Sequence, residues 1–246
     1  MTATPPEIVT LRLPLVNAYL VRSHRWVLID AGAPGDEQRI LRAAARSGVR
    51  PRDIALIVLT HGHVDHFGSA AVLRRLTGAP VAVHQADADY VRSGRNPEMR
   101  RTGLEGLIFR PFLPWSGPAL EPDIVFGADF DPGVYGLDAT VLPTPGHSPG
   151  SVSFLLPGGA LLAGDLLRGG FLGGRVVPRR PAPPFYAADL PGLWASLGRV
   201  LELPLTTLYV GHGGPLDAGV VRRRYGHVNH RRKNHGTVGT AGPTAA

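Results

Sequence analysis

The stretch LTHGHVDHFG at residues 59–68 constrains the fold of this chain more than any other feature. It places three histidines and an aspartate within six residues, directly after the apolar run IALIVL. A continuous apolar run of this length is typical of a strand that is buried on both faces. Loops that follow such strands are where rigid scaffolds present functional side chains. We therefore expect the cluster to lie at a strand end and to carry chemistry.

The residue types of this cluster fit a divalent metal ion. Imidazole nitrogens two residues apart, followed by a carboxylate and a third imidazole, suit a borderline-soft ion such as Zn²⁺. Similar strand-end settings recur further along the chain, in PTPGHSPG, LLAGDLL and YVGHGG. Histidines that only cap a helix would not explain this recurrence. The sequence therefore predicts a metal site built from His61, His63, Asp65, His66, His147, Asp165 and His212.

Strand-like runs and helical segments alternate along the chain. Strands are expected over IVTLRL, NAYLVRS, RWVLIDAG, IALIVL, PVAVH, DATVLPT, SVSFLLP, GALLAGD and TTLYVGHGG. Helices are expected over DEQRILRAAARSG, SAAVLRRLTG and PGLWASLGRVLEL. This order in both halves predicts sheets that are covered by helices on their outer faces. The stretch near 95–137 is rich in Pro and Gly, and we expect an irregular substrate-loop insert there.

Charge and composition set further limits. Residues 222–246 hold six of the 26 basic residues and no acid, which leaves 20 basic against 19 acidic residues in the body of the chain. We therefore expect one domain over residues 1–221 and a basic, disordered tail over 222–246. There is no cysteine, which excludes thiolate ligands and disulfides. No signal-peptide or membrane-span pattern is present, so a cytoplasmic protein is expected.

The motif His61-Gly62-His63-Val64-Asp65-His66 resembles the H-x-H-x-D-H signature of the metallo-β-lactamase superfamily of metallohydrolases. The resemblance runs from about residue 8 to residue 218, and the later family positions are matched in order by His147, Asp165 and His212. It implies the α/β class and an αββα four-layer sandwich, with two mixed sheets flanked by helices. It also implies two divalent metal ions, with Zn²⁺ as the expected ion and Fe or Mn as alternatives.

The resemblance further implies a role for each of these residues. One metal ion would be held by His61, His63 and His147, and the other by Asp65, His66 and His212. Asp165 would bridge the two ions, while Asp30 would orient a ligand without binding metal. A hydroxide between two such ions attacks an electrophilic carbonyl. The full ligand set is most similar to the glyoxalase II and lactonase branches, which cleave thioesters or lactones.

Two other activities stay open within this superfamily. One is a mononuclear iron persulfide dioxygenase, and the other is a phosphodiesterase or nuclease that acts on nucleic acid. The near-neutral body of the chain argues against nucleic acid as a partner, and no membrane partner is expected. We expect a small-molecule substrate, and a homodimer is an open alternative to a monomer.

The segment Gly146-His147-Ser148-Pro149-Gly150 matches the nucleophile-elbow pattern G-x-S-x-G. That elbow uses the backbone N–H of the residue after the serine, and Pro149 has none. We therefore do not expect Ser148 to be a catalytic nucleophile.

Substrate specificity is expected to lie in RRTGLEGLIFRPFLPWSGP, residues 100–118, whose apolar residues are too dense for a solvated loop. They form either a packing or dimer surface, or a lid in which Phe112 and Trp115 contact an apolar substrate. Arg168 either contacts a substrate anion or forms a surface salt bridge.

Overall fold

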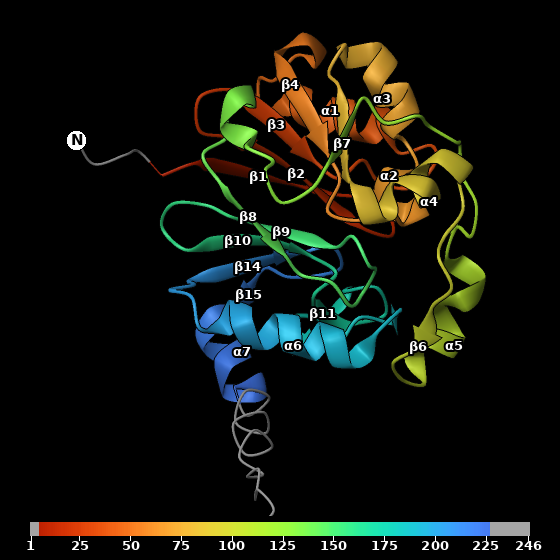
Figure 1. Ribbon diagram of the computed structural model, residues 1–246, viewed down its shortest axis with the longest axis vertical. Coiled ribbons are helices and arrows are strands. Elements are labelled where there is room, and N and C mark those ends of the chain that lie inside the picture. The colour runs from red at the N-terminus through yellow and green to blue at the C-terminus, as the bar shows by residue number, and fades with distance from the viewer. Residues whose placement is uncertain (1–4, 227–246) are drawn as a thin grey trace, which may run out of the picture.

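Two β-sheets lie face to face at the centre of the structure, and helices cover their outer faces (Figure 1). The computed structural model describes residues 5–226 of the chain. The first sheet pairs β1 with β2 and β2 with β3 antiparallel, and its remaining neighbours are parallel. Its strands, in spatial order, are β1 (Glu7–Arg12), β2 (Asn17–Arg22), β3 (Trp26–Ile29), β4 (Ile54–Val58), β5 (Val81–His84) and β7 (Ile124–Phe126).

The second sheet is also mixed, because β10 and β14 are parallel while its other pairs are antiparallel. Its strands, in spatial order, are β15 (Leu216–Asp217), β14 (Thr207–Val210), β10 (Ala160–Gly164), β9 (Val152–Leu155) and β8 (Thr140–Pro143). Two small ribbons complete the strands: β11 (Arg168–Phe171) with β12 (Val176–Ala182), and β13 (Tyr186–Ala187) with β6 (Arg100–Arg101).

Helices lie on the outer face of each sheet. The first sheet is covered by α1 (Glu37–Arg46) and α3 (Ala70–Thr77), and the second by α6 (Leu190–Leu201) and α7 (Ala218–Tyr225) (Figure 1). The shorter helices are α2 (Val64–Phe67), α4 (Ala88–Ser93) and α5 (Glu105–Phe109). Single 3₁₀ turns are η1 (Pro51–Asp53), η2 (Gln85–Asp87), η3 (Arg110–Phe112) and η4 (Pro132–Tyr135). Within residues 5–226, no helix is long and apolar enough to cross a membrane.

Three apolar layers follow from the alternation of side chains along buried strands. Leu56 of β4 packs between the sheets with Phe154 of β9, whereas Ile57 packs outward with the helix residue Leu73. A third layer joins the second sheet to α6 and α7. The run IALIVL is therefore apolar throughout because both of its faces are covered, as the sequence predicts. The predicted αββα four-layer sandwich is confirmed.

Several elements lie outside the expected strands and helices, among them β6, β13, β15, α4 and α5. The stretch predicted to be irregular contains β7, which extends the first sheet beside β5, and Asp123 fixes its start by accepting a hydrogen bond from the Val81 N–H (2.9 Å). The ribbon of β11 and β12 also lies outside the predicted strands. A three-residue strand and a glycine-rich ribbon give too little side-chain alternation to be recognised.

The folded chain also continues past residue 221, where we expected the tail to begin. Helix α7 runs to Tyr225, whose ring is buried and stacks on Trp194 of α6. The guanidinium group of Arg222 donates to the carbonyl oxygens of Leu201 (3.2 Å), Leu203 (2.6 Å) and Leu205 (3.2 Å). Leu201 is the last residue of α6 and the other two residues lie just after it, so Arg222 ties α7 to the end of α6. The rest of the expected tail lies outside the described residues.

Arg222 is therefore expected to stabilise the domain. Arg222→Ala should lower the free energy of unfolding by about 2 kcal/mol, because it leaves three carbonyl oxygens without a charged donor. The exposed neighbour Arg223 is the matched control, and Arg223→Ala should change this free energy by less than about 0.5 kcal/mol. Urea denaturation followed by circular dichroism measures both free energies. Equal effects of the two substitutions would show that the hydrogen bonds of Arg222 do not stabilise the domain.

Candidate metal centre

Seven side chains from both sheets converge where parallel strands end, and we call them the His/Asp cluster. The loop after β4 contributes His61 and His63 and leads into α2, which carries Asp65 and His66. The second sheet contributes one residue after each of β8, β10 and β14. All seven side chains are buried. The cluster consists of His61, His63, Asp65, His66, His147, Asp165 and His212.

The ligand atoms of the cluster form overlapping groups of three, and within each group they lie within 4.8 Å of one another. One group is His61, His63 and His147, a second is Asp65, His66 and His212, and a third is His61, His66 and Asp165. The carboxylate of Asp165 lies between the first two groups. Its oxygens lie 3.5 Å from Nε2 of His147, 3.6 Å from Nε2 of His66 and 3.1 Å from Nε2 of His212.

The imidazole rings are held from behind through Nδ1. His147 Nδ1 donates to the carbonyl oxygen of Tyr186 (2.9 Å), and His212 Nδ1 donates to that of Leu15 (2.7 Å). A carbonyl oxygen only accepts, so the proton of each neutral ring sits on Nδ1 and the lone pair on Nε2. The Nε2 atoms that point into the cluster are thus in the form that binds metal.

Asp30 and Thr60 fix two further rings in the same way. The Thr60 hydroxyl donates to Asp30 (2.9 Å), so its oxygen accepts from Nδ1 of His61 (2.9 Å). Asp30 also accepts from the Thr60 N–H (2.8 Å) and from Nδ1 of His66 (2.8 Å). Its backbone has φ of 62°, a strained conformation that is enriched at functional sites. Asp30 therefore lies behind the cluster and orients its rings.

The donor set passes a simple test for a metal ion. Buried polar atoms normally have hydrogen-bond partners. Among the described residues, Nε2 of His61, His63, His66 and His147 and Oδ1 of Asp165 are buried and have none. These atoms point into one space, and nitrogen and carboxylate oxygen are ligands of zinc, iron and manganese. The residues present therefore fit divalent metal ions.

Burial and neighbouring charges set the protonation of the cluster. Burial lowers the pKa of His61, His63 and His147, and the neighbouring imidazoles lower the pKa of His61 further. Burial also acts to lower the pKa of His66, but Asp30, Asp165 and Asp65 outweigh it and raise that pKa to about 10. The pKa of Asp165 lies below its ordinary value, because nearby imidazoles outweigh the effect of its burial.

Asp87 is a buried acid that the sequence analysis did not single out. One carboxylate oxygen accepts from the Gly62 N–H (2.7 Å) and from the Ser148 hydroxyl, and the other accepts from the Gly150 N–H (2.6 Å). It therefore clamps the loop of His61 and His63 to the loop of His147. The same contact accounts for Ser148, which is fully buried with its hydroxyl directed at Asp87. The position of Asp87 three residues after β5, another parallel strand of the first sheet, is the signal that could have indicated it.

Gly211 is a second residue that the sequence analysis passed over. A Cβ at this position would lie 2.1 Å from Oδ1 of Asp165 and 2.7 Å from a ring carbon of His66. Only glycine therefore allows the loop of His212 to approach the cluster.

The residues predicted to bind substrate fall into different surroundings. Phe112 lines an apolar cavity of about 320 Å³ that also reaches His212, whereas Trp115 lines a separate pocket. Arg168 does not reach the cluster cavity. Its side chain is 6% exposed, forms a short ion pair with Glu105 of α5, and lies 4.1 Å from the ring centroid of Phe185. Arg168 therefore forms a salt bridge, but a buried one and not the surface salt bridge that was expected.

Replacing Asp87 tests how far the cluster depends on this clamp. Asp87→Ala leaves two buried N–H groups unpaired, so the free energy of unfolding should fall by about 3 kcal/mol and metal affinity by about 10- to 100-fold. Asp89→Ala is the matched control, because the Asp89 side chain is 92% exposed. Denaturation and metal titration should leave that control close to wild type. A wild-type metal affinity in Asp87→Ala would contradict the clamp.

Comparisons with known proteins agree with this geometry. The chain is 37% identical over 134 residues to a hydroxyacylglutathione hydrolase of Anaeromyxobacter dehalogenans (strain 2CP-C), covering 54% of this chain and 40% of that protein. The B3 metallo-beta-lactamase BLEG-1 has a TM-score of 0.66 at 24% identity, covering 91% of this chain and 99% of that one. TTHA1623, solved in a di-iron-bound form, has a TM-score of 0.61 at 30% identity, covering 89% of this chain and 98% of that one.

The family model of the metallo-beta-lactamase superfamily matches residues 11–212, from β1 to the last histidine of the cluster. This match spans most of the chain, and the fold and the cluster agree with it. The chain therefore belongs to the metallo-beta-lactamase superfamily and is a metal-dependent hydrolase.

Proposed function

We propose that this protein is a binuclear metal-dependent hydrolase that cleaves a thioester, a lactone or a related ester. The observation that carries the proposal is the position of Asp165 between two complete groups of ligands. A mononuclear site would need only one such group. The second group and the intervening carboxylate therefore favour two metal ions over one.

Each group would hold one ion. His61, His63 and His147 would hold the first, while Asp65, His66 and His212 would hold the second. Asp165 would contact both ions. Zn²⁺ is the ion that this nitrogen-rich donor set favours, although the di-iron form of TTHA1623 makes iron a direct alternative.

The bound ions would polarise the substrate carbonyl and supply a nucleophilic water at neutral pH. In the overall reaction the acyl–sulfur or acyl–oxygen bond breaks, and a water molecule gives its hydroxyl to the acyl carbon and a proton to the leaving group. The protein's own contribution is positional: the hydrogen bonds that Nδ1 of His66, His147 and His212 donates hold each Nε2 toward the cluster. Ser148 takes no part, because its hydroxyl is buried against Asp87.

Two observations favour a carbonyl substrate over a phosphodiester. The first is the identity of 37% to a hydroxyacylglutathione hydrolase, over about half of this chain. The second is the apolar cavity beside His212, which Ile108, Phe112 and Leu172 line. An acyl chain fits such a cavity, whereas the sugar–phosphate backbone of a nucleic acid does not.

Metal content tests the proposal directly. Elemental mass spectrometry of the purified protein should find about two equivalents of divalent metal, as two ligand groups require. Asp165→Ala should lower this content and abolish hydrolysis of thioesters and lactones, and a chelator should do the same to the wild type. Asp138→Ala is the control, because Asp138 is an exposed acid that pairs with His24. One equivalent of iron with no hydrolysis would support the persulfide dioxygenase instead.

The apolar cavity yields a second test. Phe112→Ala should raise KM for octanoyl and decanoyl esters by about fivefold and leave KM for acetyl esters nearly unchanged, because about 0.8 kcal/mol is lost for each methylene that is no longer buried. Leu107→Ala is the matched control, since Leu107 lies on α5 but lines the other pocket. An equal effect on KM for short and long esters would show that the cavity does not bind the acyl chain.

A further inference from the structure

A second pocket, of about 750 Å³, shares no lining residue with the apolar cavity. Met99 and Tyr186 line both this pocket and the small cavity at the cluster, which is lined by His63, Asp65, His147, Asp165 and His212 as well. A molecule whose reacting carbonyl lies at the cluster can therefore extend past Met99 and Tyr186 into the larger pocket.

The charge of this pocket is one-sided. Three arginines line it, and its lining contains no Asp or Glu: the arginines are Arg100, Arg101 and Arg110. Within residues 5–226, none of their guanidinium groups forms an ion pair or donates a hydrogen bond. This contrasts with Arg168 and Arg222, whose guanidinium groups are used inside the fold. Unpaired arginines around a concave surface attract anions.

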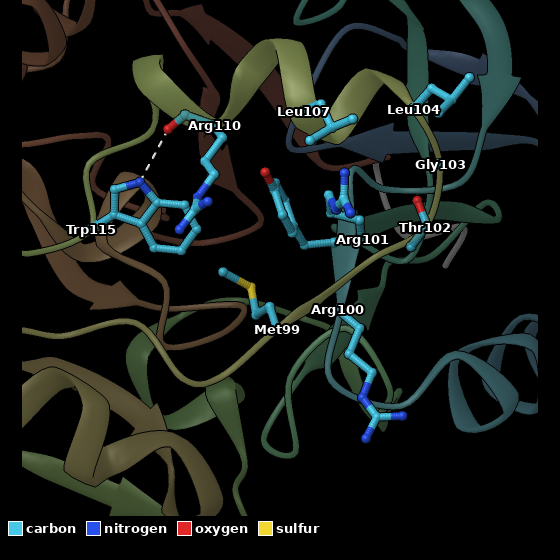
Figure 2. A pocket seen from close by; sticks show the side chains of 10 residues that line it. Met99, Arg100, Arg101, Thr102, Gly103, Leu104, Leu107, Arg110 and Trp115 are labelled. Atoms are coloured by element: carbon cyan, nitrogen blue, oxygen red, sulfur yellow. Dashed lines mark hydrogen bonds between the residues drawn. The ribbon is translucent and has the colours of Figure 1, made fainter.

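Two of the three arginines face the same space. Figure 2 shows Arg110 beside Trp115 and Arg101 directed toward Leu107, whereas Arg100 points the opposite way. Arg100 and Arg101 are neighbours in β6, so their side chains leave opposite faces of the strand. The guanidinium carbon of Arg110 lies 5.9 Å from the Trp115 ring centroid.

The pocket is fixed relative to the cluster. Strand β6 pairs with β13, so that Arg101 lies opposite Tyr186, whose carbonyl oxygen holds the ring of His147. On the other side, Asn96 accepts from the Val64 N–H (2.7 Å) at the start of α2 and donates to the Pro114 carbonyl (3.0 Å). Hydrogen bonds thus connect both ends of the pocket wall to residues of the metal centre.

We propose that Arg101 and Arg110 bind an anionic group of the substrate, a carboxylate or a phosphate, on an arm that extends beside Trp115 and Tyr186. The planar guanidinium group binds both anions through paired N–H donors. The proposal rests on the proposed function and deepens it, because it places the scissile carbonyl between two unlike arms. One arm is apolar and lies in the cavity of Phe112, and the other is anionic and lies in the arginine-lined pocket.

The first test measures binding without turnover. Metal-free protein is titrated by calorimetry with benzoate, with phenyl phosphate and with neutral benzamide, so that neither metal nor catalysis contributes. Arg101→Ala and Arg110→Ala should each weaken anion binding by about tenfold, since each removes a charged donor. Arg100→Ala is the matched control and should bind like wild type. Tighter binding of benzoate identifies a carboxylate arm, and tighter binding of phenyl phosphate identifies a phosphate arm.

The second test uses turnover by the metal-loaded enzyme. Two pairs of hexanoate-type esters are compared. In the first pair the alcohol part carries either a carboxylate or a carboxamide, and in the second pair the acyl part does. At least one pair should show a preference of about tenfold in kcat/KM for the acid, lost in Arg101→Ala and kept in Arg100→Ala. Hydrolysis of both members at equal rates, with no anion binding, would overturn the arginine subsite alone. Loss of all metal-dependent hydrolysis would instead overturn the proposed function.

Discussion

The metal centre depends on hydrogen bonds that hold buried imidazoles from behind. Taking polar rings out of water is costly unless each finds a partner, and a ligand with the wrong tautomer cannot bind metal. The partners come from distant parts of the chain. His212 in the second sheet donates to Leu15 in the turn between β1 and β2, and Asn17 of β2 donates to the carbonyl oxygens of Val210 (3.0 Å) and Gly213 (2.7 Å). The bonds that orient the ligand therefore also join the two sheets.

Much of this arrangement could be predicted from the sequence, because it rests on short-range patterns. The apolar run before His61 marks a covered strand, and ligand-type residues after later strands mark the same edge of a sandwich. What could not be predicted depends on long-range pairing. Asp87 is one acid among 19 until the fold brings it to Gly62 and Gly150. Arg222 belongs to a basic run in the sequence, and only the packing of α7 on α6 directs it to the end of α6.

The segment from Met99 to Trp115 is where the local sequence was least informative, and it lines both of the pockets that are proposed to bind the substrate. Its dense apolar residues indicate packing or substrate contact, and several of them line the two pockets. Helix α5 separates the two pockets, because Ile108 lines the apolar cavity and its neighbour Leu107 lines the arginine-lined pocket. Under the proposed function, substitutions in this one segment would change substrate preference without touching a ligand of the cluster.

The ion pair between Glu105 and Arg168 decides whether this segment is a wall or a moving flap. Arg168 follows Asp165 by three residues and is almost fully buried, with its guanidinium stacked on Phe185. Phe185 in turn contacts the ring of His212, with centroids 6.0 Å apart. Lifting α5 away would leave the charge of Arg168 buried without its partner, at a cost of about 3–5 kcal/mol. This cost favours a fixed wall over a lid, and under the proposed function that wall would select substrates that match an apolar and a cationic side.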